Sequence, residues 1–88
     1  MAKHMSEVEL KEFLVERVSL ALRVKKKDMD PDTPFTRYGL ESIDGVILAM
    51  EIEEEIRTPL EPTLLWEYNT IHLCASFLHK HISEMAAA

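Results

Sequence analysis

Apolar residues recur at intervals of three and four positions in three stretches of the chain, a spacing that places them on one face of a helix. In the first stretch, Ser6 and Glu9 have the spacing of a capping box, which predicts a helix over residues 6–24. Its apolar stripe consists of Leu10, Phe13, Leu14, Val18, Ala21 and Leu22. In the last stretch, Thr70 is expected to cap a helix. The narrow stripe of that helix consists of Ile71, Cys74, Ala75, Leu78 and Ile82.

The middle stretch, residues 42–56, carries two apolar stripes instead of one. At about 100° per residue, one stripe consists of Leu48, Ala49, Ile52 and Ile56, and the opposite one of Ile43, Val46, Ile47 and Met50. The acids Asp44, Glu51 and Glu55 separate the stripes on one flank, while Glu53 and Glu54 extend the second stripe. A small bundle buries one face, so we assign the first stripe to the core and the second to a partner. Burial of both stripes is the alternative.

Two breaker-rich connections separate the helices. The first, KKKDMDPDTPFTRYGLE, has two prolines and one glycine, which predict a long loop packed down by Met29, Phe35 and Leu40. The lysines at positions 25–27 are interpreted as a solvated helix end, where cations suit the helix dipole.

The second connection, residues 57–69, has two prolines that allow only a short helical turn. This turn is expected to bring Leu64, Leu65 and Trp66 toward the core. No stretch alternates as a strand would. The predicted fold is therefore all-α: a small four-helix bundle of three main helices, one short helix and a long first loop.

Composition narrows the class of protein. The chain has 88 residues and is expected to form one domain over residues 6–83, with residues 1–5 a leader or expression remnant and residues 84–88 a disordered tail. Its net charge is −6, with 16 acidic and 10 basic residues, which argues against nucleic acid and favours a basic protein surface as partner. A single cysteine and the absence of a long apolar run predict a soluble, reduced, cytoplasmic monomer that does not bind membranes.

The chemically distinctive stretch is YGLESIDG, residues 38–45, in which Ser42 opens the middle helix. A helix start is favourable for anions, above all phosphate, because its backbone N–H groups are free and the dipole is positive there. The ordinary role of a serine at this position is that of an N-cap, which contributes about 1 kcal/mol. The stretch alone leaves both roles open.

From about Val8 to Ile82 the chain resembles acyl carrier proteins, most closely the carrier domains of polyketide synthases. The family pattern Gly-Leu-Asp-Ser-Leu corresponds to Gly39, Leu40, Glu41, Ser42 and Ile43 here. Around it, DPDTPFTRYGL, VILAMEIEEEI and PTLLWEYNTI are similar to the family's loop, second helix and third-helix segment, in the same order. Gly39-Leu40 favours an acyl or polyketide carrier over a peptidyl carrier.

The resemblance implies a carrier with no catalytic activity of its own. Ser42 would bear a covalent 4′-phosphopantetheine arm, transferred from coenzyme A by a phosphopantetheinyl transferase that uses Mg²⁺. The arm's thiol would hold acyl or polyketide intermediates as thioesters for ketosynthase, acyltransferase and other synthase enzymes. The partner face would comprise Glu41, Ile43, Asp44, Ile47, Met50, Glu53 and Glu54.

Three positions depart from the family pattern. Glu41 replaces the usual aspartate, which bears on the choice of modifying transferase. Ile47 stands where family members often have an acid, which suggests a more apolar docking face. Asn69 replaces the proline that usually precedes Thr70, so the start of the last helix is expected to be less rigid.

Three other classes of site fit the residues less well. Asp28, Asp30 and Asp32 match the start of a calcium-binding loop, but the sixth and twelfth positions do not. A serine hydrolase would need Gly-x-Ser-x-Gly after a strand. His72, His79 and His81 lack metal-ligand spacing. The serious alternative is a helical adaptor that binds another protein through the Ile43 stripe without a prosthetic group.

Overall fold

Four helices carry the fold of the computed structural model, which describes residues 4–87. They are α1 (Glu7–Leu22), α2 (Ser42–Ile56), α3 (Leu64–Glu67) and α4 (Ile71–Ala87). Two 3₁₀ turns, η1 (Lys26–Asp28) and η2 (Phe35–Tyr38), lie in the first connection. No strand occurs between residues 4 and 87, so the prediction of an all-α bundle with one short helix and a long first loop is confirmed.

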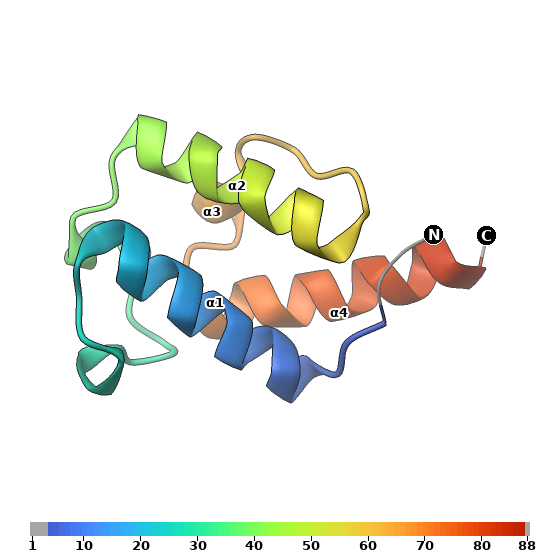
Figure 1. Cartoon of the computed structure of the whole chain (residues 1–88), viewed down its shortest axis with the longest axis horizontal. Helices are drawn as coiled ribbons and strands as arrows, with labels where there is room; N and C mark the ends of the chain where they lie inside the picture. Colours follow the sequence, from blue (N-terminus) through green and yellow to red (C-terminus); the bar gives the residue numbers. More distant parts are fainter. Residues whose placement is uncertain (1–3, 88) are drawn as a thin grey trace.

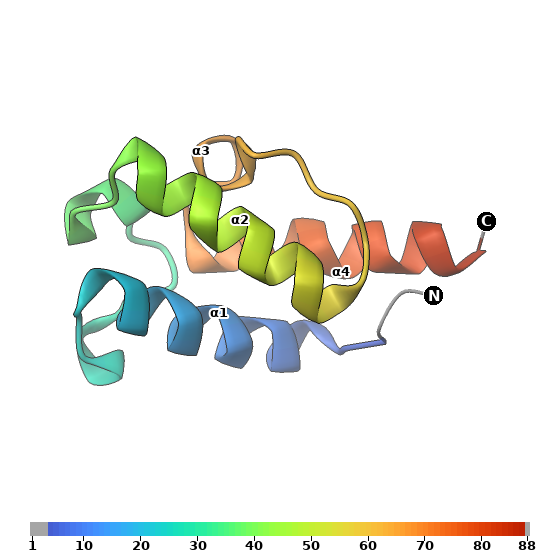
Figure 2. The same cartoon turned by 45° about the horizontal axis from the view of Figure 1, so that its top comes forward.

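The long helices are arranged as a small bundle (Figure 1). α1 and α4 run side by side in opposite directions, and α2 crosses over them in the direction of α4. The short α3 lies beside α2 and above the start of α4 (Figure 2). The long first connection closes the left end of the molecule in Figure 1, and it is from this end that α2 begins.

The core follows the predicted stripes. α2 contributes Leu48, Ala49, Ile52 and Ile56, and α4 contributes Ile71, Cys74, Ala75, Leu78 and Ile82, all buried. α1 contributes Leu10, Leu14 and Val18, with Phe13 and Leu22 partly buried and Ala21 exposed. Met29, Phe35 and Leu40 of the long loop are also buried, as predicted. Burial of one α2 stripe, at about 25 cal/mol per Å² of apolar area, fixes the rotation of this helix on the bundle.

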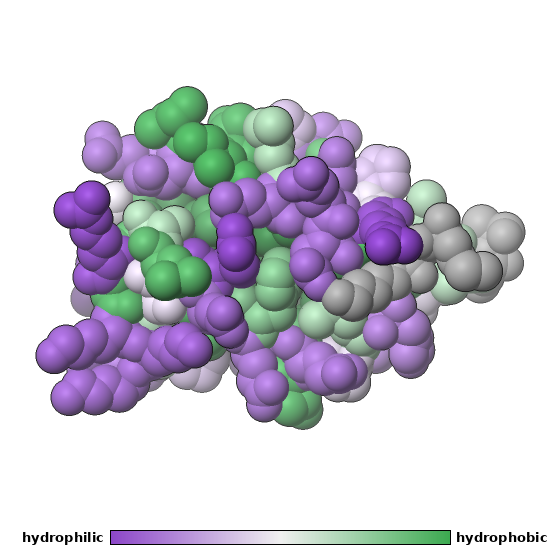
Figure 3. All heavy atoms as spheres, viewed as in Figure 1, coloured by the Kyte–Doolittle hydropathy of each residue, from purple (hydrophilic) through white to green (hydrophobic). Residues whose placement is uncertain are grey.

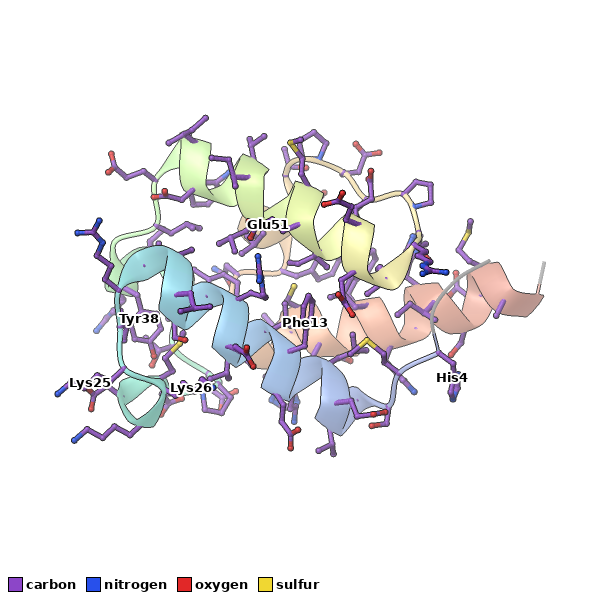
Figure 4. The ribbon with its side chains drawn as sticks, viewed as in Figure 1. His4, Phe13, Lys25, Lys26, Tyr38 and Glu51 are labelled. Atoms are coloured by element: carbon purple, nitrogen blue, oxygen red, sulfur yellow. The ribbon has the colours of Figure 1, made fainter. Side chains whose placement is uncertain are left out.

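α1 begins as predicted and ends two residues early. The Ser6 hydroxyl accepts a hydrogen bond from the Glu9 N–H at 3.1 Å, and the Glu9 carboxylate accepts one from the Ser6 N–H at 2.9 Å. Arg23 adopts a left-handed backbone with φ of 57°, which ends the helix at Leu22. The lysines at positions 25–27 are exposed but lie in and beside η1, so their assignment to the end of the first helix was wrong. Figure 4 shows Lys25 and Lys26 in this connection.

The C-terminal tail also differs from expectation. α4 continues through Ala87, so residues 84–87 are helical and their prediction as disordered was wrong. Nothing in this segment breaks a helix: Glu84, Met85 and the alanines after them are all good helix formers. Residues 1–3 of the expected leader and Ala88 lie outside the described residues. Met5, at the described end of that leader, packs against the core.

Three hydrogen bonds of the backbone fasten the long first loop. The His72 N–H donates to the Pro31 carbonyl, and the Phe35 N–H donates to the Asn69 carbonyl, both at 2.9 Å. Within the loop, the Asp30 N–H donates to the Tyr38 hydroxyl at 2.7 Å. The loop is therefore tied to the start of α4, and it gives the N-terminus of α2 a fixed base.

Candidate functional site

The backbone before α2 turns Ser42 outward. Gly39 has φ of 90°, a left-handed conformation that favours glycine, and Leu40 is buried as an anchor. Glu41 is extended and occupies the N-cap position, and its N–H donates to the Asp44 carboxylate at 3.1 Å. Ser42 is the first residue of the helix and follows a turn, a buried anchor and a cap that together fix its direction.

The Ser42 side chain is not used to hold the fold. It is exposed, and within residues 4–87 its hydroxyl makes no hydrogen bond. The N-cap role is filled by Glu41, with Asp44 as its reciprocal partner. The alternative of Ser42 as an ordinary N-cap is therefore wrong, and its hydroxyl is free for chemistry.

The second stripe of α2 lies on the surface. Ile43 and Met50 are 64% and 65% exposed, Ile47 is 47% exposed, and Val46 is also exposed. Figure 3 shows hydrophobic side chains gathered along the top of the molecule, where the first turns of α2 lie in Figure 1. The alternative in which both stripes are buried is wrong, and the exposed stripe is continuous with Ser42.

The four predicted partner acids differ in their surroundings. Glu41 and Glu54 are exposed, and within residues 4–87 the Glu54 carboxylate makes no hydrogen bond or ion pair. Asp44 is half-buried and caps the helix. The Glu53 carboxylate accepts a hydrogen bond from the Leu60 N–H at 2.7 Å, which fastens the loop after α2. Glu54 thus has no role in local structure, whereas Glu41 and Asp44 also cap α2 and Glu53 also fastens the loop after it.

Trp66 was expected in the core but lies on the surface beside the site. It is 36% exposed, while its neighbours Leu64 and Leu65 are buried. Its indole covers Gly45 of α2: a Cβ built on Gly45 would come within 3.3 Å of Trp66 Cζ2. In the four-residue helix α3, Leu64 and Leu65 point into the core and Trp66 lies along α2. This arrangement results from packing and was not evident from the spacing of the residues.

A groove runs between α1 and α2 on the other flank of the site. Its volume is about 320 Å³, and Leu20 and Ile47 form part of its exposed apolar lining. The Arg17 guanidinium lies 2.8 Å from the Glu51 carboxylate across it, and this hydrogen bond raises the pKa of Arg17. Glu51 projects from the side of α2 that faces α1 (Figure 4). The ion pair links the two helices nine residues after Ser42, about two and a half turns along α2.

The other titratable groups that stand out in the sequence have local roles. The His72 ring lies 3.2 Å from the Asp32 carboxylate, and His81 Nε2 lies 3.1 Å from the Pro59 carbonyl oxygen. In the part of the chain that the structure describes, no three His, Cys, Asp or Glu residues are grouped to hold a metal ion. Burial raises the pKa of the Cys74 thiol to about 12, as expected for a core cysteine.

The sequence has relatives among very large synthases. Residues 12–78 match the family described as phosphopantetheine attachment site. The chain is 32% identical over 69 residues to polyketide synthase PksN of Bacillus subtilis, an alignment that covers 78% of this chain and 1% of the synthase. It is 33% identical over 73 residues to polyketide synthase PksL of the same organism, covering 83% of this chain and 2% of that synthase.

Solved structures share the fold. A free-standing peptidyl carrier protein from Acinetobacter baumannii superposes with a TM-score of 0.81 at 35% identity, covering 91% of this chain and 96% of the other. Acyl carrier protein LipD from Actinoplanes friuliensis superposes with a TM-score of 0.74 at 28% identity, covering 96% and 97%. An HMG-ACPI domain of the CurA module from Lyngbya majuscula, at 23% identity, has the same fold with a TM-score of 0.85, covering 98% and 87%.

The helical bundle and the family match over residues 12–78 define a carrier domain. The chain belongs to the phosphopantetheine attachment site family, whose members bind 4′-phosphopantetheine covalently, so the resemblance inferred from the sequence is confirmed. It spans between 1% and 2% of the length of the synthases named above. Among the described residues, no helix has the length and apolar character needed to cross a membrane.

Proposed function

We propose that Ser42 is the attachment residue and that the arm it bears presents acyl or polyketide intermediates, as thioesters, to the enzymes of a synthase. The observation that carries this proposal is the exposed Ser42 hydroxyl, which has no hydrogen-bond partner within residues 4–87 and begins α2 beside an exposed apolar face. The pentapeptide from Gly39 to Ile43 that matches the family pattern supports the same residue.

The residues present fit the prosthetic group. Attachment requires a nucleophilic oxygen that a transferase can reach, and Ser42 Oγ is accessible on a helix whose opposite side is packed into the core. The oxygen attacks the pantetheine-bearing phosphorus of coenzyme A, a P–O bond to Ser42 forms, and the pyrophosphate bond breaks. Adenosine 3′,5′-bisphosphate leaves, and the hydroxyl proton passes to a base of the transferase. The arm then supplies a thiol for thioester formation.

This chain's own contribution is positioning and recognition rather than catalysis. Gly39, Leu40 and the Glu41–Asp44 cap hold Ser42 in one direction. Ile43, Ile47 and Met50 provide a small apolar contact, and Glu41 and Glu54 provide charges that steer a basic partner. A small interface of this kind suits partners that must bind and leave repeatedly.

The proposed partners are a phosphopantetheinyl transferase, a ketosynthase, an acyltransferase and other synthase enzymes. The two synthases named above, at 32% and 33% identity, support polyketide synthesis as the pathway. We assign the protein to the cytoplasm, where coenzyme A is available and where the unpaired, buried thiol of Cys74 stays reduced. We also assign it as a monomer.

Intact-protein mass spectrometry tests the attachment. The wild-type protein, incubated with coenzyme A, Mg²⁺ and a broad-specificity phosphopantetheinyl transferase, should gain the mass of one phosphopantetheine. Ser42→Ala should gain nothing, whereas Ser76→Ala, which removes an exposed serine from α4, should be modified like the wild type. Modification of Ser42→Ala, or no modification of the wild type by several transferases, would contradict the proposal.

A further inference from the structure

Trp66 and Gly45 form a contact that neither the core nor the proposed docking stripe requires. Gly45 lies inside α2, where glycine is a poor helix former, yet it is buried because the Trp66 indole covers it. A Cβ on Gly45 would lie 3.3 Å from Cζ2, 3.4 Å from Cε2 and 3.6 Å from Nε1 of Trp66. The absence of a side chain at position 45 therefore allows the ring to lie directly against the helix backbone.

This contact places the indole beside the attachment residue. Ser42 and Gly45 are three residues apart on α2, so they share one face, with roughly 5–6 Å between their Cβ positions. The ring packed on Gly45 is thus about one helical turn from the Ser42 side chain. Trp66 keeps 36% of its surface exposed, although the two residues before it are buried.

The chemistry of the exposed ring matches the first part of the arm. Next to its phosphate, the pantetheine arm has two methyl groups on one carbon, then a hydroxyl and an amide. The exposed part of Trp66 offers an apolar ring surface for the methyl groups, and within residues 4–87 its Nε1–H makes no hydrogen bond. Tryptophan is suited to such a position because one part of its ring system is apolar and its edge is polar.

The opposite flank of Ser42 is less suitable for the arm. The groove between α1 and α2 is lined by two carboxylates, Asp44 and Glu51, and by one guanidinium, Arg17. The guanidinium is already paired with Glu51 at 2.8 Å. The lining therefore has a net negative charge, which repels a phosphodiester. The indole carries no charge.

We propose that Trp66, seated on Gly45, is a platform that packs the dimethyl segment of the phosphopantetheine arm against the α2–α3 side of the domain. This inference rests on attachment of the arm at Ser42. The platform holds the first part of the arm along the protein surface and leaves the distal thiol free to move.

Trp66 is the chain's single tryptophan, so its fluorescence reports on the platform directly. After mass spectrometry establishes complete loading of Ser42, the acrylamide quenching constant of Trp66 should fall by at least about half, because the arm covers the exposed ring. Nuclear Overhauser contacts should appear between the indole protons and the two methyl groups. Ser42→Ala, treated with the same coenzyme A and transferase, is the control and should keep the quenching of the unmodified protein.

Two variants test the geometry. Gly45→Ala should displace the ring and weaken the contacts to the methyl groups. In the loaded wild type, the ring current of the indole should shift the resonances of the two methyl groups upfield. Trp66→Leu should abolish this shift while Ser42 is still modified. Circular dichroism establishes that each variant is folded. If Gly45→Ala unfolds, the Trp66→Leu spectrum decides alone.

The outcomes separate this inference from the proposed function. Full modification at Ser42 with unchanged quenching and no contacts overturns the platform and leaves the attachment intact. A fall in quenching in Ser42→Ala also overturns the platform, because it would show that free coenzyme A covers the ring. If Ser42 is not modified at all, both proposals fail.

Discussion

Replacement of one isoleucine on each side of α2 tests whether this helix is two-sided. Ile52 and Ile43 are the same residue type in the same helix, but Ile52 is fully buried and Ile43 is 64% exposed. Ile52→Ala leaves a cavity among packed core side chains, whereas Ile43→Ala removes atoms that water already reaches. The two variants therefore differ in burial and little else.

The expected magnitudes are well separated. Truncation of a fully buried isoleucine to alanine lowers the free energy of unfolding by about 2–5 kcal/mol. A domain of this length has a total of roughly 4–13 kcal/mol, so Ile52→Ala removes a large part of it and lowers the melting temperature by at least about 8 °C. The exposed Ile43 should change the free energy by no more than about 0.5 kcal/mol.

Urea unfolding followed by circular dichroism measures both variants against the wild type. Equal slopes of free energy against urea concentration would establish that the same amount of surface is exposed in each case. The reasoning fails if the two substitutions cost the same within about 0.5 kcal/mol, or if Ile43→Ala is the more destabilising. Either result would mean that the helix is rotated on the bundle and that Ile43 does not face a partner.

Three further predictions concern the surface and the thiol. Met50→Glu should lower kcat/KM of a partner enzyme about tenfold, through loss of an apolar contact. Val8→Glu, at an equally exposed position on α1, is the control and should have no effect. A loss of the helical circular-dichroism signal in Met50→Glu would refute the assignment of Met50 to the exposed partner face. A double-mutant cycle with Arg17→Met and Glu51→Gln should give a coupling of about 0.2–1 kcal/mol that falls in 1 M salt; an unchanged coupling would contradict a solvent-screened pair. Because burial raises the pKa of the Cys74 thiol to about 12, the folded protein without the arm should release no colour with Ellman's reagent at pH 8, and should react once unfolded in urea.

The pattern of residues along the chain was sufficient to predict the helices and to select Ser42 as a candidate. Regular spacing of apolar residues depends only on the 3.6-residue period of the α-helix, so the stripe that contains Leu48 and Ile52 could be assigned to the core in advance. The capping box at Ser6 is equally local, since both of its hydrogen bonds join residues three apart. Ser42 is proposed as the attachment residue from its place in a five-residue pattern, which is also a property of the chain alone.

Tertiary packing decided where side chains without a periodic context would lie. Trp66 follows two buried leucines in a helix of only four residues, which is too short for its spacing to define a face; contact with Gly45 determines its position. The Glu53 carboxylate accepts a hydrogen bond from the Leu60 N–H, seven residues later, because the loop after α2 folds back. The Arg17–Glu51 pair likewise needs α1 and α2 side by side. Local periodicity fixes which residues share a face of a helix, but the neighbour of that face depends on how distant segments meet.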